Sequence, residues 1–259
     1  MLSIHHDTPP PCPARFNMAE HVMAAGRAVP DKVALEVIGR PGEVRERWTY
    51  RALDAAIGAV AGGLAAAGLR PGGRVALRLG NDVDFPLVFF GAQRLGAVPV
   101  ALSSALSAVE LAPMLADVAP DLIVRDAALP LPPSAAPVVE ARGLREGDVL
   151  GAHDTGADDP AYIVFTSGSS GRAKAVVHAH RAAHARRMMW DGWYGLRASD
   201  RVLHAGAFNW TFTLGTGLTD PWAAGARALV HVGGGDMGDV IAAHRPTIFA
   251  AVQIGRAHV

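Results

Sequence analysis

Apolar residues along this chain follow two different spacings, and the alternation of the two predicts the fold class. Short apolar runs, typical of buried strands, are followed by stretches in which apolar residues recur with the period of a helix. In one such stretch, Leu53, Ile57, Val60 and Leu64 line a single helix face. Strands that alternate with helices in this way predict an α/β fold with a largely parallel sheet.

The same patterns give boundaries for the elements. Strands are expected over residues 33–38, 44–50, 75–79, 98–102, 122–124, 162–165, 202–205, 228–232 and 247–252. Helices are expected over residues 18–28, 53–64 and 84–95, and after Ser107-Ala-Val-Glu110, which has the spacing of a capping box. Gly68 and Gly96 are expected to end two of these helices. Residues 127–160 are expected to form an extended loop, and a helix rich in His, Arg and Met is expected directly after the Gly/Ser segment that follows residue 165.

Composition narrows the class of protein. The chain has 259 residues, of which 50% are hydrophobic and 19% charged, so it is long enough to bury a sizeable core. Its formal net charge is zero, which gives no electrostatic footprint for nucleic acid or for an anionic membrane. No apolar run has the length of a membrane span, and the N-terminus has no signal-peptide pattern. Cys12 is the only cysteine, so we expect no disulfides and a reducing, cytoplasmic location.

The strongest chemical signal is a Gly/Ser segment that directly follows an apolar strand. Tyr162-Ile-Val-Phe165 leads into glycines that let backbone N–H groups approach an anion, hydroxyls that donate to phosphate oxygens, and a lysine. Of the 24 basic residues only Lys32 and Lys174 are lysines, which makes a lysine at this place informative. The residues predicted to hold a triphosphate are Thr166, Ser167, Gly168, Ser169, Ser170, Gly171 and Lys174.

Two familiar loops do not fit this segment. A Walker loop requires G-x-x-x-x-G-K-[ST], but here the two glycines are three positions apart and Ala175 follows Lys174. A nucleophile elbow requires G-x-S-x-G, and Gly168-Ser-Ser-Gly171 is one residue too short. A flexible linker would not be preceded by an apolar strand. The segment therefore predicts phosphate binding of another kind.

With three earlier segments, the Gly/Ser segment resembles the motifs of the adenylate-forming (AMP-binding) superfamily, which includes acyl- and aryl-CoA synthetases, adenylation domains and luciferases. The earlier segments are Trp48-Thr-Tyr-Arg-Ala-Leu-Asp54, residues 67–76 and residues 92–100. Ala173 stands where the family usually has Pro and Ala175 where Gly is common, and neither change removes a phosphate-binding group. The resemblance implies an incomplete large N-terminal domain, with mostly parallel sheets flanked by helices and without the small C-terminal domain.

The resemblance also implies a reaction. A carboxylic acid would be activated with ATP and Mg²⁺ to an acyl-adenylate, with release of pyrophosphate, and then transferred to coenzyme A. The Gly/Ser segment would hold the β- and γ-phosphates. Phe208, Asn209 and Trp210 fall where the family lines its carboxylate pocket. The catalytic lysine and the adenine and ribose motifs of the family lie later than this sequence reaches, so we assign no catalytic residue here.

Three histidines near the loop raise the question of a metal site. His178, His180 and His184 form H-x-H-x-x-x-H, but no Cys, Asp or Glu lies near them in a ligand-like pattern. The resemblance accounts for the first two as the tail of the phosphate-loop motif. We therefore expect structural histidines and no metal-binding residues.

The end of the sequence carries a separate signal. Residues 254–259, Ile-Gly-Arg-Ala-His-Val, resemble one reading frame of a common sequencing adapter, so we expect a non-native tail and a gene that continues. The expected organisation is a disordered arm (1–16), a partial AMP-binding domain (17–253) and that tail, with the fragment inactive alone. Two other functions stay open: an adenylating enzyme that loads a carrier protein, and a catalytically dead nucleotide-binding module. The oligomeric state and the identity of the acid are not predicted.

Overall fold

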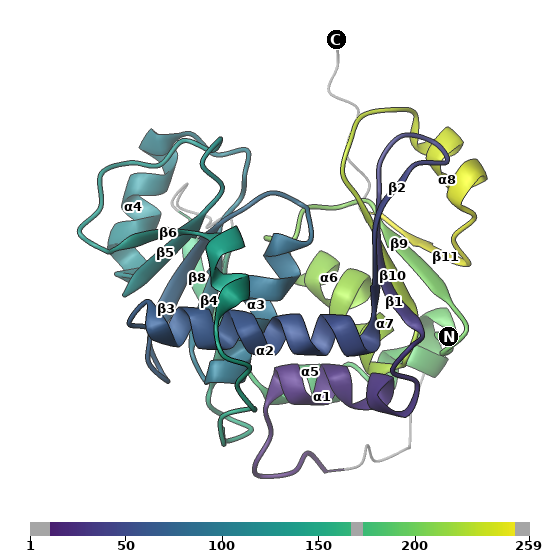
Figure 1. Cartoon of the computed structure of the whole chain (residues 1–259), viewed down its shortest axis with the longest axis horizontal. Coiled ribbons are helices and arrows are strands. Elements are labelled where there is room, and N and C mark those ends of the chain that lie inside the picture. The colour runs from purple at the N-terminus through teal and green to yellow at the C-terminus, as the bar shows by residue number, and fades with distance from the viewer. Residues whose placement is uncertain (1–10, 167–172, 252–259) are drawn as a thin grey trace, which may run out of the picture.

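The computed structural model describes residues 11–166 and 173–251, and these residues form two mostly parallel β-sheets with helices between and outside them (Figure 1). The six-stranded sheet has the order β6-β5-β3-β4-β7-β8, and the five-stranded sheet has the order β11-β9-β10-β1-β2. Only the pairs β7–β8 and β1–β2 are antiparallel among the named strands. This architecture confirms the predicted α/β class.

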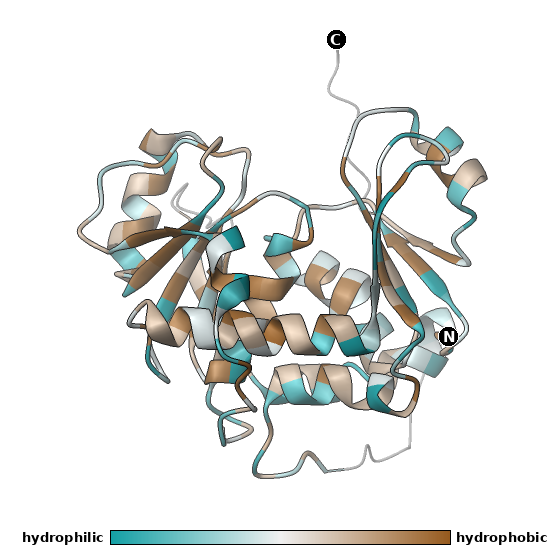
Figure 2. Cartoon of the chain, in the orientation of Figure 1, coloured by the Kyte–Doolittle hydropathy of each residue, from teal (hydrophilic) through white to brown (hydrophobic). Residues whose placement is uncertain are grey.

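The strands lie close to their expected positions. Those of the six-stranded sheet are β3 (Arg74–Arg78), β4 (Val98–Ala101), β5 (Leu122–Arg125), β6 (Val138–Glu140), β7 (Pro160–Thr166) and β8 (Lys174–Ala179). Those of the five-stranded sheet are β1 (Val33–Ile38), β2 (Val44–Thr49), β9 (Arg201–His204), β10 (Arg227–His231) and β11 (Ile248–Ala250). Figure 2 shows apolar residues concentrated in the strands of the six-stranded sheet, as expected of parallel strands covered on both faces.

The helices fill the space between the sheets and cover their outer faces. The α-helices are α1 (Met18–Ala24), α2 (Tyr50–Ala66), α3 (Asp84–Leu95), α4 (Ala108–Val118), α5 (Arg181–Ala185), α6 (Thr211–Leu214), α7 (Asp220–Ala223) and α8 (Met237–His244). Shorter 3₁₀ and π turns occupy Ala25–Ala28, Ala141–Glu146, Trp190–Tyr194 and Gly215–Thr219. α4 packs on one face of the six-stranded sheet through Leu111 and Leu115, and α8 packs on the five-stranded sheet through Val240.

Local sequence signals explain where several helices begin and end. Ser107 and Glu110 form the predicted capping box at the start of α4. Gly96 ends α3 with φ +80°, and Gly68 follows α2 with φ +99°; both are left-handed conformations that glycine adopts without a Cβ penalty. These boundaries confirm the predictions for the two helices.

Two expectations were wrong. Residues 127–160 are not only loop, because β6 and the Ala141–Glu146 turn lie within them. The element directly after the Gly/Ser segment is a strand, β8, and the helix α5 begins only at Arg181. β8 is a strand because its backbone pairs with β7 along six residue pairs, from Thr166↔Lys174 to Pro160↔Ala179. Its β-branched Val176 and Val177 suit a strand better than a helix.

One hydrophobic core joins the two sheets. The largest cluster of buried side chains includes Leu77 of β3 and Val230 of β10, together with the inner faces of α2 and α3. Trp222 lies fully buried in this cluster; its ring is 5.4 Å from that of Phe90, and its Nε1 donates to the backbone of Ala34 at 2.9 Å. The two sheets are therefore parts of a single packed unit.

Candidate functional site

The β7–β8 hairpin presents two of the predicted phosphate-binding side chains. Thr166 and Lys174 are direct cross-strand partners at the end of the hairpin where the Gly/Ser segment connects the strands, so their side chains project from the same face as neighbours. Both are exposed, and Lys174 has no ion-pair partner among residues 11–166 and 173–251. Ser167, Gly168, Ser169, Ser170 and Gly171 lie outside the described residues, so their predicted role stays a prediction.

A pair of stacked rings holds the two strands of the hairpin together further from the Gly/Ser segment. The rings of Tyr162 and His178, which pair across the strands, stack at 4.6 Å with planes 6° apart. Burial raises the pKa of the Tyr162 hydroxyl to about 12 and lowers that of His178, so both rings are neutral near pH 7. The stacked rings therefore hold the two strands together at the base of the hairpin, away from Thr166 and Lys174.

His180 joins the end of the hairpin to the N-terminal helix. Its side chain is fully buried, and the backbone N–H of Met18 donates to its Nδ1 at 3.0 Å. Burial lowers the pKa of His180 to about 4. His184 instead lies near the rings of Phe16 and His21, with centroids 5.8 and 6.3 Å away. Within the described residues, no group of three His, Cys, Asp or Glu side chains is placed to hold a metal ion.

The segment predicted to line the carboxylate pocket follows β9, and the structure separates its three members. Phe208 is buried in the core, with its ring 5.1 Å from that of Phe85. Trp210 is 59% exposed. Asn209 is half-buried, and its Oδ1 is a buried atom without a hydrogen-bond partner in the described part of the chain. Their assignment to a substrate pocket stays a prediction.

An asparagine from the other sheet fixes this segment. Asn81, in the loop after β3, donates through Nδ2 to the carbonyl of Gly206 at 2.7 Å and accepts from the backbone N–H of Phe208 at 3.1 Å. β3 and β9 belong to different sheets, so Asn81 links the carboxyl ends of both. In open α/β sheets this edge is the usual place for ligands.

His204, the last residue of β9, was not predicted from the sequence. Its side chain is only 6% exposed, and neither ring nitrogen has a hydrogen-bond partner among the described residues. Its ring stands edge-on to that of Phe212, with centroids 4.9 Å apart and planes at 70°. Burial lowers the pKa of His204 to about 4. Its place at the carboxyl end of a parallel strand was the available sequence signal.

A buried ion pair joins α7 to the chain that precedes β9. Asp220 of α7 accepts from Arg186 at 2.8 and 2.5 Å and from the Tyr194 hydroxyl at 2.6 Å. Burial and the Asp220 carboxylate raise the pKa of Tyr194, so the hydroxyl stays a proton donor. Gly215 makes room for the Arg186 guanidinium, which a Cβ at that position would overlap. Sequence reasoning missed this trio because its members meet only in the folded chain.

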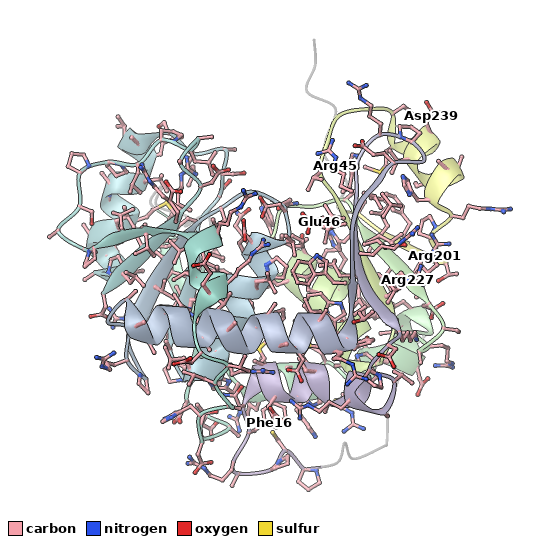
Figure 3. The ribbon with its side chains drawn as sticks, in the orientation of Figure 1. Phe16, Arg45, Glu46, Arg201, Arg227 and Asp239 are labelled. Carbon is pink, nitrogen blue, oxygen red and sulfur yellow. The ribbon has the colours of Figure 1, made fainter. Side chains whose placement is uncertain are left out.

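A second charged group lies on the far side of the five-stranded sheet. Glu36 of β1 is buried and accepts from Arg47 at 2.9 Å and from Arg227 at 3.3 Å. Figure 3 shows Arg227 and Arg201 on the side of the sheet that faces away from the centre of the molecule. This group supports the sheet and is separate from the segment after β9.

Three features together define the N-terminal architecture of an adenylate-forming protein. They are the two sheets of this topology, the Gly/Ser segment between the paired strands β7 and β8, and the segment after β9 that Asn81 holds at the carboxyl ends of the strands. The model of the AMP-binding enzyme family matches residues 22–253, and the chain belongs to that family.

Relatives of known activity have consistent names. The chain is 29% identical to the 3-hydroxybenzoate–CoA/4-hydroxybenzoate–CoA ligase of Thauera aromatica, over 85% of this chain and 49% of that protein. It is 32% identical to the long-chain-fatty-acid–CoA ligase FadD13 of Mycobacterium tuberculosis, over 61% of this chain and 34% of that protein. Among solved structures, the anthranilate CoA ligase AuaEII in complex with anthranoyl-AMP matches with TM-score 0.81 and 23% identity, over 92% of this chain and 49% of that one.

These comparisons also set the scale of the chain. It spans about half the length, or less, of the curated relatives that it matches. In the described part, no helix has the length and apolar character needed to cross a membrane.

Proposed function

We propose that this chain is the phosphate-loop part of an acid–thiol ligase, which activates a carboxylic acid with ATP and passes the acyl group to coenzyme A. The observation that carries the proposal is the β7–β8 hairpin in a chain of the AMP-binding family. It ends in the exposed Thr166 and Lys174, and Lys174 has no ion-pair partner among the described residues. The names of the relatives, which include benzoate and fatty-acid ligases, support an acyl- or aryl-CoA product.

The proposed reaction balances without a redox partner. A carboxylate oxygen bonds to the α-phosphorus of ATP. The bond from that phosphorus to the oxygen bridging the α- and β-phosphorus breaks, and pyrophosphate leaves. The sulfur of coenzyme A then bonds to the acyl carbon, the bond from that carbon to the AMP oxygen breaks, AMP leaves, and the thiol proton passes to solvent. When bound, Mg²⁺ would neutralise part of the phosphate charge.

The residues of this chain would bind and orient the triphosphate. The Lys174 ammonium would compensate the charge that develops on the departing pyrophosphate, and the Thr166 hydroxyl would donate to a phosphate oxygen. Neither group transfers a proton. The role of the loop is therefore positioning and charge compensation.

The test compares variants in acid-dependent pyrophosphate release. It uses the 259-residue chain and also the complete product of the source gene, sequenced past the codon for Gln253. We expect Lys174→Ala to slow release by about 10²-fold with little change in acid binding, since a transition-state contact is lost. Arg142→Ala, which removes an exposed cation elsewhere, serves as the control.

Other outcomes would change the assignment. Equal losses in Lys174→Ala and Arg142→Ala would show that Lys174 does not contact the phosphates. Binding of ATP without pyrophosphate release by the complete gene product would support a catalytically dead nucleotide-binding module. Product analysis with coenzyme A and with a phosphopantetheine-bearing carrier protein would identify the acceptor.

A further inference from the structure

Arg78, the last residue of β3, is a buried cation without a carboxylate beside it. Its side chain is 0% exposed, and among the described residues it has no ion-pair partner. Burial lowers the pKa of Arg78, and no carboxylate lies close enough to raise it again. Arg94 is the contrasting case, because this buried arginine pairs with Asp54. Burying a charge without an opposite charge is costly, so packing alone does not explain Arg78.

Three backbone carbonyls hold the guanidinium of Arg78. Its Nε donates to the carbonyl of Pro130 at 3.0 Å, its Nη2 to that of Leu106 at 2.6 Å, and its Nη1 to that of Ser103. These carbonyls belong to the segments that follow β4 and β5. Carbonyl oxygens accept hydrogen bonds but carry no net charge. The positive charge of Arg78 is therefore not neutralised by any described residue.

Arg78 lies at the same edge of the sheet as the proposed phosphate-binding residues. β3, β4 and β7 are consecutive in the strand order and run parallel, so their carboxyl ends meet at one edge. In the pairing of β4 with β7, Ala101 lies opposite Val164. Two residues further along come Ser103, which Arg78 contacts, and Thr166, which ends β7. Neighbouring strands lie about 4.8 Å apart, so the end of β7 is about 10 Å from that of β3.

We propose that Arg78 supplies a fixed positive charge to the phosphate-binding end of the β7–β8 hairpin, and that the bound triphosphate is the counter-ion that its surroundings lack. This inference rests on the proposed function. Arg78 is closed to solvent and does not touch the phosphates, so it is a positioning residue that acts through its electric field. Salt screens a buried charge less than a surface charge. At about 10 Å and an effective dielectric constant of about 20, one charge changes the affinity for an anion by about 10-fold.

The test measures the binding of inorganic tripolyphosphate to the 259-residue chain by titration calorimetry. This probe carries the charge of the triphosphate and needs no adenine site. We expect Arg78→Met, which keeps the length of the side chain and removes its charge, to weaken binding by about 10-fold. Arg78→Lys keeps the charge but loses the three-carbonyl contact, so it should retain most of the affinity.

Two further variants locate the effect. Arg74→Met removes an arginine from the same face of β3 at the opposite edge of the sheet, where Arg74 donates to the carbonyl of Val118 at 2.8 Å. Its affinity should equal that of the wild type. Lys174→Ala removes the proposed phosphate contact and should weaken binding at least as much as Arg78→Met.

A spectroscopic reading needs no variant to fold. In ¹⁵N-arginine spectra of the wild type, the Nε resonance of Arg78 should shift when tripolyphosphate is added, because the field at this buried group changes. The Nε resonance of Arg74 should not shift. An unchanged Arg78 resonance at saturating tripolyphosphate would contradict the inference.

Several titration results would also overturn it. Wild-type affinity in Arg78→Met would show that the charge does not act on the phosphates, and an equal loss in Arg78→Lys would show that only the carbonyl contacts matter. No binding by the wild type, or binding that Lys174→Ala leaves unchanged, would do the same. If Lys174→Ala slows pyrophosphate release by the complete gene product and Arg78→Met does not, the proposed function stands while the inference fails. If no acid supports release, the proposed function fails whatever the titrations show.

Discussion

At the scale of single residues, the chain depends on histidines that burial keeps neutral. His21, His180 and His204 all have a pKa of about 4, against about 6.5 for an exposed histidine, with burial as the main cause. Each serves a different purpose in the structure. His21 packs against Phe16, His180 accepts a backbone hydrogen bond, and His204 has no partner among the described residues.

His180 allows a prediction about pH. Between pH 6.5 and 4 the unfolded chain binds a proton at this residue that the folded chain does not. The free energy of unfolding should therefore be highest above pH 6.5 and should fall with acidification, by about 1.4 kcal/mol per pH unit for this residue. Urea unfolding measured across this range gives the slope.

Two variants isolate the contribution of His180. His180→Asn removes the titration but keeps an acceptor for Met18 N–H. The dependence of the unfolding free energy on pH should therefore become shallower by up to the contribution of one proton, while the free energy of unfolding at pH 7 changes little. His180→Leu removes both, so it should also lower stability at pH 7, by about 1–3 kcal/mol. A wild-type slope in both variants would show that His180 does not titrate as described.

At the scale of elements, helix α2 is held by contacts between backbones. A Cβ at Gly62 would overlap the carbonyl of Asp148, and one at Gly63 would overlap that of Leu144. The segment 144–150 therefore lies directly on the helix, where no side chain fits. Three glycines inside one helix lower its intrinsic propensity, and this packing is the compensation.

Gly62→Ala is expected to destabilise the protein even though alanine favours helices. The clash is with backbone, which cannot rotate away, so the loss should be about 1–3 kcal/mol in the free energy of unfolding. Gly143→Ala is the control, because nothing lies within 4 Å of its added Cβ. If Gly62→Ala is neutral or stabilising under urea, the close approach of segment 144–150 is wrong.

Sequence patterns predicted elements well where the signal is local. The bounds of α3, the capping box at Ser107 and the glycine ends of two helices depend on neighbouring residues, and the structure has them as expected. β8 and β6 depend on pairing with strands that the sequence does not specify nearby, and both were missed. For the site, the residue types of the Gly/Ser segment were enough to predict phosphate binding. Asn81 and His204 were not predicted, because their importance comes from partners or neighbours that are distant in the sequence.

At the scale of the whole molecule, the shared core predicts that the two sheets unfold together. Leu77 of β3 and Val230 of β10 belong to one buried cluster. Leu77→Ala should remove about 2–5 kcal/mol of stability, and hydrogen exchange should speed up at amides of β10 as well as β3.

A substitution outside the shared core provides the comparison. Leu111 packs α4 on the other face of the six-stranded sheet, in a separate cluster. Leu111→Ala should therefore affect amides of α4 more than amides of β10. Unchanged exchange in β10 after Leu77→Ala would show that the sheets are independent units.

The order in which the strands are made has a consequence for synthesis in the cell. β1 pairs with β2 on one side and with β10 on the other, and Arg227 of β10 contacts Glu36 at a separation of 191 residues. At about 5–20 residues per second, a ribosome takes about 10–40 s to cover that distance. During this time the second edge of β1 has emerged without its partner, while β3 to β8 are made and can pair with one another. The five-stranded sheet is thus begun before the six-stranded one, and β9, β10 and β11 can join it only after β3 to β8 have been made.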